Sequence, residues 1–303
     1  MRPWWGLLFK TRVKIHMKKY IALLITLFIL AAPQNAAALS IYDLQPKVES
    51  ASITAKAVIV LNQVTGDILY EQGSNDVRIP ASLVKLTTVL VVLDTNPDWN
   101  KVCTVSEQDR VGGVAITKSG SSMPYTMNNL LYATLMPSAN DAATALARCT
   151  GLSHAEFLAR MQAKAREQGA LNTTYVDASG ISSSNTTTAA DIARIANAAF
   201  STEKVRNITR TQSYRLCTTT KSCQTIRSTN PLLADKQLIT VAGKTGTLDG
   251  AINFAGSFKD PKGHYFIVVV LGGSSKESRF TEAKQLVEFA STRADWSDQF
   301  AVK

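Results

Sequence analysis

Apolar and polar positions alternate along this chain with two different periods. Between about residues 106 and 200 the apolar residues recur every three or four positions, which is typical of amphipathic helices. Thr126 stands where a helix N-cap is expected, Pro137 separates the first two helices, and Gly169 suits a helix C-cap. The helices expected in this part are 127–135, 141–148, 154–168 and 188–200.

Shorter apolar runs with strand character lie on both sides of this helical region. Thr65-Gly66-Asp67 joins the first two runs as a β-hairpin. The strands expected are 57–61, 68–70, 102–105, 214–216, 239–247, 251–258 and 265–271, and a helix over 276–290 follows them. Because consecutive strands are close in sequence, we expect an α+β fold, with an antiparallel β-sheet flanked by helices and a mostly helical insert, rather than repeated βαβ units.

A further helix is expected to begin near Ser82 and to end near residue 94. Pro80 fixes φ and suits a first helical turn, and the apolar run from Leu83 to Leu93 then continues into a core. Residues three apart share a helix face, so Ser82 and Lys85 are expected to lie one above the other.

Residues 1–38 are expected to be a secretory signal peptide. Lys18 and Lys19 precede the apolar stretch 20–32, and three alanines end at Ala38. The apolar stretch is shorter than the roughly twenty residues that span a membrane. We therefore expect cleavage after Ala38, with Met17 as an alternative start, export to the periplasm or cell envelope, and no stable membrane anchor. Residues 39–303 are expected to form one domain of two lobes, with the helical insert at about 106–200.

Removal of the expected signal peptide changes the charge balance. Residues 1–38 hold six Lys and Arg residues and no Asp or Glu, so the net charge of +10 becomes +4 without them. No Lys/Arg cluster appears in the remainder, which argues against nucleic acid as a partner. A mildly basic balance is typical of ordinary solubility and also suits an anionic envelope polymer.

The cysteines and histidines indicate which disulfides and cofactors to expect. All four cysteines follow residue 38, and an oxidising compartment would allow two disulfides, for which we pair Cys103 with Cys149 and Cys217 with Cys223. His154 and His264 are far apart and no H-E-x-x-H occurs, so no metal or other cofactor is expected. A Ser-His-Asp triad is likewise not favoured.

Ser82-Leu-Val-Lys85 is the first candidate motif. A hydroxyl becomes a nucleophile when a base takes its proton, and a lysine desolvated by an apolar helix can be that base. The S-x-x-K pattern also occurs at Ser201–Lys204, so on its own it is not specific.

Two further motifs lie downstream. Ser138-Ala-Asn140 falls in the joint between two expected helices, where a hydroxyl and an amide can project into a cleft. The same S-x-N pattern recurs at 183–185 and 228–230, but without rigid flanking helices. Lys244-Thr245-Gly246 lies in an expected strand and occurs once, and its glycine lets another backbone or a ligand approach closely.

These three motifs, in this order, are those of serine β-lactamases and penicillin-binding proteins. With Asn172–Gly180 and Thr188–Asp191, which also match, the chain resembles a low-molecular-mass penicillin-binding protein of the D-alanyl-D-alanine carboxypeptidase/endopeptidase family over about residues 45–290. The resemblance implies the serine β-lactamase/DD-peptidase-like fold and a hydrolase of peptidoglycan stem peptides, acting in cell wall biogenesis and cell shape.

The same resemblance implies a role for each candidate residue. Ser82 would be acylated and Lys85 would accept its proton, with Ser138 and Asn140 relaying a proton to the leaving amine and orienting the substrate. Lys244 and Thr245, within the segment 244–247 that also holds Gly246, would bind the substrate carboxylate. The N–H groups of Ser82 and Thr247 would form the oxyanion hole. β-Lactam antibiotics would acylate Ser82 as covalent inhibitors.

Alternatives remain at this point. The chain ends soon after its last expected helix, without the C-terminal β domain and amphipathic helix of longer carboxypeptidases, which favours a DD-endopeptidase but also fits a DD-carboxypeptidase. A class A β-lactamase would need a glutamate to activate water, and Glu167 is expected to be an exposed helical residue. Ser-Ala-Asn in place of Ser-Asp-Asn also argues against a β-lactamase. A non-catalytic penicillin- or peptidoglycan-binding module is the third alternative.

Overall fold

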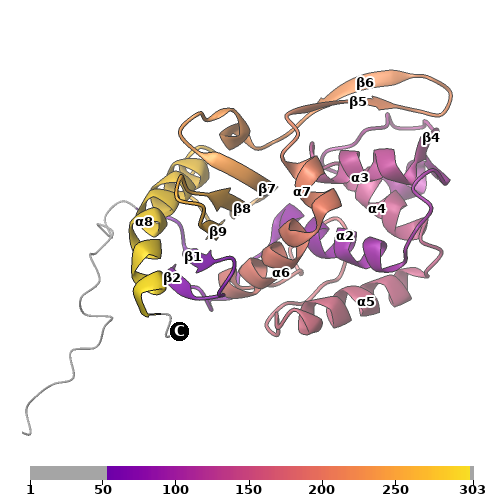
Figure 1. Ribbon diagram of the computed structural model, residues 1–303. Coiled ribbons are helices and arrows are strands. Elements are labelled where there is room, and N and C mark those ends of the chain that lie inside the picture. The colour runs from indigo at the N-terminus through magenta and orange to yellow at the C-terminus, as the bar shows by residue number, and fades with distance from the viewer. Residues whose placement is uncertain (1–52, 301–303) are drawn as a thin grey trace, which may run out of the picture. The chain divides into compact units, whose positions relative to one another are not determined.

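A five-stranded antiparallel sheet organises the computed structural model, which describes the backbone of residues 53–300 and the side chains of residues 53–292 (Figure 1). Its strand order is β2-β1-β9-β8-β7, so strands from the two ends of the described chain pair at its centre. The strands are β1 (Ala57–Asn62), β2 (Ile68–Gln72), β7 (Ile239–Leu248), β8 (Ala251–Lys259) and β9 (Tyr265–Leu271). β7 is an edge strand, which leaves one of its sides open to other parts of the molecule.

Helices cover both faces of the sheet, which explains why its central strands are apolar at nearly every position. Ile267, Val269 and Leu271 of β9 belong to the large core cluster that α2 and α6 also enter. Val270 faces the other way and pairs with Phe254, whose ring packs edge-on against Phe280 of α8. The alternation therefore places α6 on one face and α8 on the other, as Figure 1 shows.

The helices group on the side of the sheet away from α8. They are α2 (Val84–Asp94), α3 (Met127–Leu135), α4 (Asn140–Arg148), α5 (His154–Glu167), α6 (Ala189–Ser201) and α7 (Glu203–Thr209). α8, on the other side, spans Ser278–Phe300. α2 is buried at every residue from Val84 to Val92, since other helices surround it. The Thr126 side chain caps α3, as predicted, and the Thr188 side chain caps α6, which therefore begins one residue later than predicted. No described helix is both long and apolar enough to cross a membrane.

Two short ribbons and two disulfides complete the described part. β3 (Val102–Val105) pairs with β4 (Met123–Thr126), and β5 (Ser213–Cys217) pairs with β6 (Cys223–Arg227). Cys103 of β3 is bonded to Cys149 at the end of α4, and Cys217 is bonded to Cys223 across the β5–β6 ribbon. Both predicted cysteine pairings are therefore confirmed.

The expected α+β fold is confirmed, and so are the predicted hairpin, the four helices of the central region and the last three strands of the sheet. The prediction lacked β4, β6 and α7. β4 and β6 each bury a single residue, Tyr125 and Ile226, so they have no alternating pattern and depend on their pairing partners. α8 begins at Ser278 and continues ten residues beyond its predicted end. The expected signal peptide, residues 1–38, lies outside the described residues.

The two disulfides should contribute unequally to stability. They close loops of 46 and 6 residues by sequence separation, and the chain-entropy model assigns about 4 kcal/mol to the longer loop and about 2 kcal/mol to the shorter. Chemical denaturation of C103A/C149A and of C217A/C223A should therefore show the larger loss of unfolding free energy for the first variant. Equal losses, or the reverse order, would contradict the loop-length explanation.

Candidate active site

Ser82 lies in a 3-10 turn, Ala81–Leu83, that leads directly into α2. Lys85 follows one turn later, and its Nζ donates to Ser82 Oγ over 2.9 Å. The predicted spacing therefore does bring the hydroxyl and the amine together. Burial of the Lys85 side chain lowers its pKa to about 7, against the opposing charges of Asp177 and Asp141. A lysine with this pKa can act as a base near neutral pH.

The Lys85 ammonium has two further acceptors. It donates to Asn140 Oδ1 over 2.7 Å and to the Ser179 carbonyl over 2.5 Å. Together with Ser82 Oγ these groups match the three N–H bonds of an ammonium. The amine is therefore held in one orientation inside the protein.

The backbone around Ser82 is held by close contacts with two glycines. Ala81, just before Ser82, has φ of 50°, which is uncommon for a residue with a Cβ. A Cβ at Gly180 would lie 2.1 Å from the Ala81 carbonyl oxygen, and one at Gly246 would lie 2.7 Å from the Pro80 carbonyl oxygen. The predicted close approach at Gly246 is thus made by the chain that carries Ser82.

Ser138 and Asn140 lie in the joint between α3 and α4, as predicted. Ser138 has φ of 66°, and α4 begins at Asn140. The Asn140 amide is used at both ends: Oδ1 accepts from Lys85, and Nδ2 donates to the Gly112 carbonyl over 2.8 Å. These two partners fix the orientation of the amide, which can then hold Lys85 or a substrate group.

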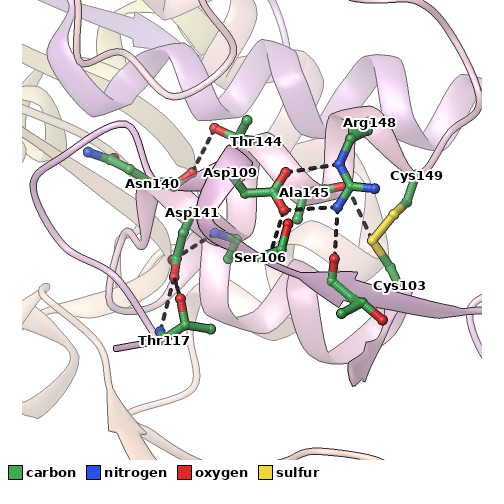
Figure 2. Close-up of polar contacts among 12 residues, drawn as sticks. Cys103, Ser106, Asp109, Thr117, Asn140, Asp141, Thr144, Ala145, Arg148 and Cys149 are labelled. Carbon is green, nitrogen blue, oxygen red and sulfur yellow. Dashed lines mark hydrogen bonds and ion pairs between the residues drawn. A yellow bond between two sulfur atoms is a disulfide. The ribbon is translucent and has the colours of Figure 1, made fainter. Parts of the chain in front are cut away.

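The helix that presents Asn140 is tied down at both ends (Figure 2). At its start, Asp141 accepts from the Thr117 N–H over 3.0 Å and from Thr117 Oγ1 over 2.7 Å. At its end, Arg148 makes two hydrogen bonds of 2.9–3.0 Å to Asp109, and the next residue, Cys149, forms the disulfide to β3. α4 is thereby a rigid support for the site.

Lys244 of β7 connects the sheet to the joint between α3 and α4. Its Nζ donates to Ser138 Oγ over 2.7 Å and to the Thr245 carbonyl over 2.8 Å, and its side chain is 1% exposed. Burial, together with the positive charges of Lys85 and Arg279, lowers the pKa of Lys244 well below its usual value. Lys244 thus contacts Ser138 directly and reaches the surface hardly at all.

Thr245 and Thr247 continue this side of the site. Thr245 Oγ1 lies 2.5 Å from Thr229 Oγ1, and Thr247 is exposed. Arg279 of α8 donates to Thr247 Oγ1 over 2.9 Å and also to the Gly246 carbonyl over 3.2 Å. Since the Thr247 oxygen accepts from Arg279, its own O–H can donate to a ligand. The structure therefore brings all eight predicted site residues into one region.

The other motif matches do not share this arrangement. Ser201 and Lys204 span the junction of α6 and α7, and the Lys204 ammonium lies over the Trp99 ring. Glu167 is exposed on α5 and pairs with Lys164, as expected of a surface residue. His154, the first residue of α5, is exposed. Within the described residues, no group of three or more His, Cys, Asp or Glu side chains could hold a metal ion.

Four groups that shape the site have no role among the sequence-based predictions. They are Arg279, Asn253, the Ser179 carbonyl with Gly180, and Asp177. Asn253 donates to the Pro80 carbonyl over 3.0 Å. No short motif marks Arg279 or Asn253, because each acts through contacts with a distant part of the chain. The only signal in the sequence for Asp177 and Gly180 is their place in the segment 172–180, which matches the family as a whole.

Comparisons with known proteins agree with this geometry. A family model described as D-alanyl-D-alanine carboxypeptidase matches residues 44–275. The D-alanyl-D-alanine endopeptidase of Haemophilus influenzae is 29% identical over 63% of this chain and 66% of its own length. The D-alanyl-D-alanine carboxypeptidase DacF of Bacillus subtilis is 27% identical over 78% of this chain and 62% of its own length. The chain thus spans about two thirds or less of these relatives.

A solved structure gives the same result in three dimensions. Penicillin-Binding Protein D2 from Listeria monocytogenes, in its cefotaxime-bound form, superposes with a TM-score of 0.70 at 28% identity, covering 81% of this chain and 99% of that one. Because the family model covers most of the chain, including every candidate site residue, this protein belongs to the D-alanyl-D-alanine carboxypeptidase family.

Proposed function

We propose that this chain is a serine DD-peptidase that forms an acyl-enzyme at Ser82 with the stem peptides of peptidoglycan. The observation that carries the proposal is the 2.9 Å contact between Ser82 Oγ and a fully buried Lys85 amine whose pKa is lowered to about 7. A nucleophile paired with a base of matched pKa is the arrangement that acyl transfer requires. The expected leader and the two disulfides support a location in the cell envelope.

The neutral form of Lys85 explains how Ser82 is activated. A neutral amine has two N–H bonds and one lone pair, and Asn140 Oδ1 and the Ser179 carbonyl are the acceptors that keep the two N–H bonds. The lone pair then faces the Ser82 hydroxyl. Lys85 takes the hydroxyl proton as Ser82 Oγ bonds to the carbonyl carbon of the D-Ala–X peptide.

The remaining groups serve the collapse of the tetrahedral intermediate. We assign the N–H groups of Ser82 and Thr247 to the oxyanion. Ser138, held by Lys244, relays to the leaving nitrogen the proton that Lys85 took from Ser82, as the C–N bond breaks. Lys85 is thereby neutral again, and water then hydrolyses the ester. Lys244, Thr245 and Thr247 face the carboxylate that follows the scissile bond, with Arg279 adding positive charge.

The carboxylates near Lys85 argue against a class A β-lactamase. Asp141 accepts from the N–H groups of Ile116 and Thr117, and Asp177 accepts from several donors of its own loop. Glu167 is exposed and paired with Lys164. Glu167 is therefore not placed as a base for water at the acyl-enzyme, which supports slow loss of a bound β-lactam.

Fluorescent penicillin should label the purified protein covalently, and Ser82→Ala should abolish the label because the attacking oxygen is gone. Labelling is read by denaturing gel, with a circular dichroism spectrum to show that the variant is folded. Labelling of S82A would overturn the assignment of the nucleophile. Chase with unlabelled penicillin should leave the bound label in place for much longer than labelling takes, whereas rapid loss would favour the β-lactamase.

The rate of acylation should rise as the pH increases through about 7. Lys85 has a folded pKa of about 7, so its ammonium form, which cannot accept the Ser82 proton, predominates below that value. Lys85→Arg keeps the charge at all these pH values and should lower the acylation rate by about a hundredfold or more. Stopped-flow measurements from pH 5 to 9 would check both, and a flat profile would exclude Lys85 as the base.

The comparisons do not distinguish an endopeptidase from a carboxypeptidase, because relatives of both names match at 29% and 27% identity. The bond that is cut distinguishes these functions. We propose hydrolysis of existing cross-links, which the similarity to a protein named D-alanyl-D-alanine endopeptidase supports, with terminal D-Ala removal as the second candidate. Incubation with cross-linked muropeptides and mass analysis would decide. Loss of the cross-linked muropeptide dimers indicates a DD-endopeptidase, and loss of terminal D-Ala alone indicates a DD-carboxypeptidase. If the protein binds penicillin but turns over neither muropeptide, it is a binding module.

A further inference from the structure

Asp177 is a half-buried carboxylate that organises the loop facing Lys85. Its Oδ1 accepts from the N–H groups of Ser179 and Gly180, both over 2.6 Å, and from Ser179 Oγ over 2.8 Å. Its Oδ2 accepts from the Ser182 N–H over 2.9 Å and from Asn185 Nδ2 over 2.7 Å. These bonds occupy both oxygens. Although burial acts to raise it, the donors from Ser182, Asn185 and Ser179 hold the pKa of Asp177 below its usual value.

The loop that Asp177 organises, residues 175–182, contacts α2 and the turn before it at several points. Tyr175 Oη lies 2.6 Å from Thr87 Oγ1, and the Ala178 carbonyl accepts from Thr88 Oγ1 over 2.6 Å. The next residues reach the catalytic turn itself: the Ser179 carbonyl accepts from Lys85, and Gly180 packs against the Ala81 carbonyl. Asp177 therefore belongs to a segment whose residues 175 and 178 contact the body of α2 and whose residues 179 and 180 contact Lys85 and the Ser82 turn.

This placement matters because the direction of the Lys85 lone pair depends on two acceptors. Asn140 Oδ1 is fixed through the bond of its amide to Gly112. The Ser179 carbonyl is fixed by the bonds that Asp177 makes to the N–H of the same residue and of the next one. If that carbonyl turns, one N–H of the neutral amine loses its acceptor and the lone pair is no longer held toward Ser82.

We propose that Asp177 is a positioning residue that orients the Lys85 amine toward Ser82 through the Ser179 carbonyl. Asp177 touches neither the nucleophile nor the substrate, and it acts through the loop. The proposal rests on the proposed acyl-enzyme function and adds to it a residue that controls the activation of Ser82.

The charges around Lys85 give this role a separate signature. The charged groups that act on Lys85 are Asp177 of the loop and Asp141 of α4, and Lys244 of β7 lies within electrostatic range. Both carboxylates favour the ammonium form. Loss of the Asp177 charge should therefore lower the pKa of Lys85 while Asp141 and Lys244 remain in place.

Asp191 supplies a matched control. It is also a buried carboxylate, and it holds the start of the same segment by accepting from the Asn172 N–H over 2.7 Å and from Thr173 Oγ1 over 2.9 Å. It makes no hydrogen bond to Ser179 or Gly180 among the described contacts. Asp191→Asn should therefore destabilise the fold as Asp177→Asn does, without changing the orientation of Lys85.

The test compares D177N, D191N and the unmodified full chain in stopped-flow acylation by a fluorescent penicillin across pH 5–9. For D177N the plateau rate of the acylation step should fall by about tenfold or more. The Kd of the initial non-covalent complex should not change. The rise of the acylation rate with pH, which we call the acidic limb of the profile, should move to lower pH. D191N should keep the plateau and the limb of the unmodified protein. Thermal unfolding of both variants shows whether their losses of stability are comparable.

Each outcome decides the proposal. A D177N profile that coincides with that of the unmodified protein overturns it, and so does an equal fall in the plateau for D191N. A lower plateau with the limb moved to higher pH also overturns it, since Asp177 would then act by keeping water away from Lys85. If the unmodified protein is not acylated at all, the proposed function fails instead, so the two failures are distinguishable.

Discussion

The whole site depends on keeping one amine, that of Lys85, inside the protein. Burial lowers the pKa of Lys85 from 10.5 to about 7 against the opposing effect of Asp177 and Asp141, a net cost to the ammonium of roughly 5 kcal/mol relative to the amine. A buried amine must also have partners for its N–H bonds, since an unsatisfied polar group in the interior is costly. Ser82, Asn140 and Ser179 supply those partners from three separate segments. The requirement for desolvation and the requirement for hydrogen bonding together account for the shape of the site.

The same constraint explains the position of the other cations. Lys244 is as deeply buried as Lys85, and Arg279 lies close behind β7, so positive charge accumulates on one side of the site. The positive charges of Lys85 and Arg279 both lower the pKa of Lys244. No described carboxylate pairs directly with Lys85 or Lys244. A site of this kind favours an anionic ligand, because the ligand supplies a negative charge next to cations that have no directly paired carboxylate. The carboxylate that follows the scissile bond of a D-Ala–X peptide fits that description.

Rigid supports surround these reactive groups. Asp141 and Arg148 hold the two ends of α4, β7 lies against the Ser82 turn through Gly246, and the loop that Asp177 organises lies along α2. The supports use backbone donors and acceptors more than side-chain pairs, so they leave little signature in the sequence. Their function is to limit how far Lys85, Ser138 and Asn140 can move, and acyl transfer is sensitive to displacements of about 1 Å.

The sequence by itself determined the fold class, most elements and the eight candidate site residues. Periodicity and capping are local properties, and S-x-x-K, S-x-N and K-T-G place their residues within one turn or one strand. Their order along the chain, rather than any one of them, separated Ser82 from the equal match at Ser201. Only the tertiary structure decided how these residues meet. It placed Lys244 on Ser138 rather than at the surface, brought Arg279 to Thr247, and made the Ser179 carbonyl a partner of Lys85. Those contacts join residues that are 106, 32 and 94 positions apart, and no local pattern encodes the packing that brings them together.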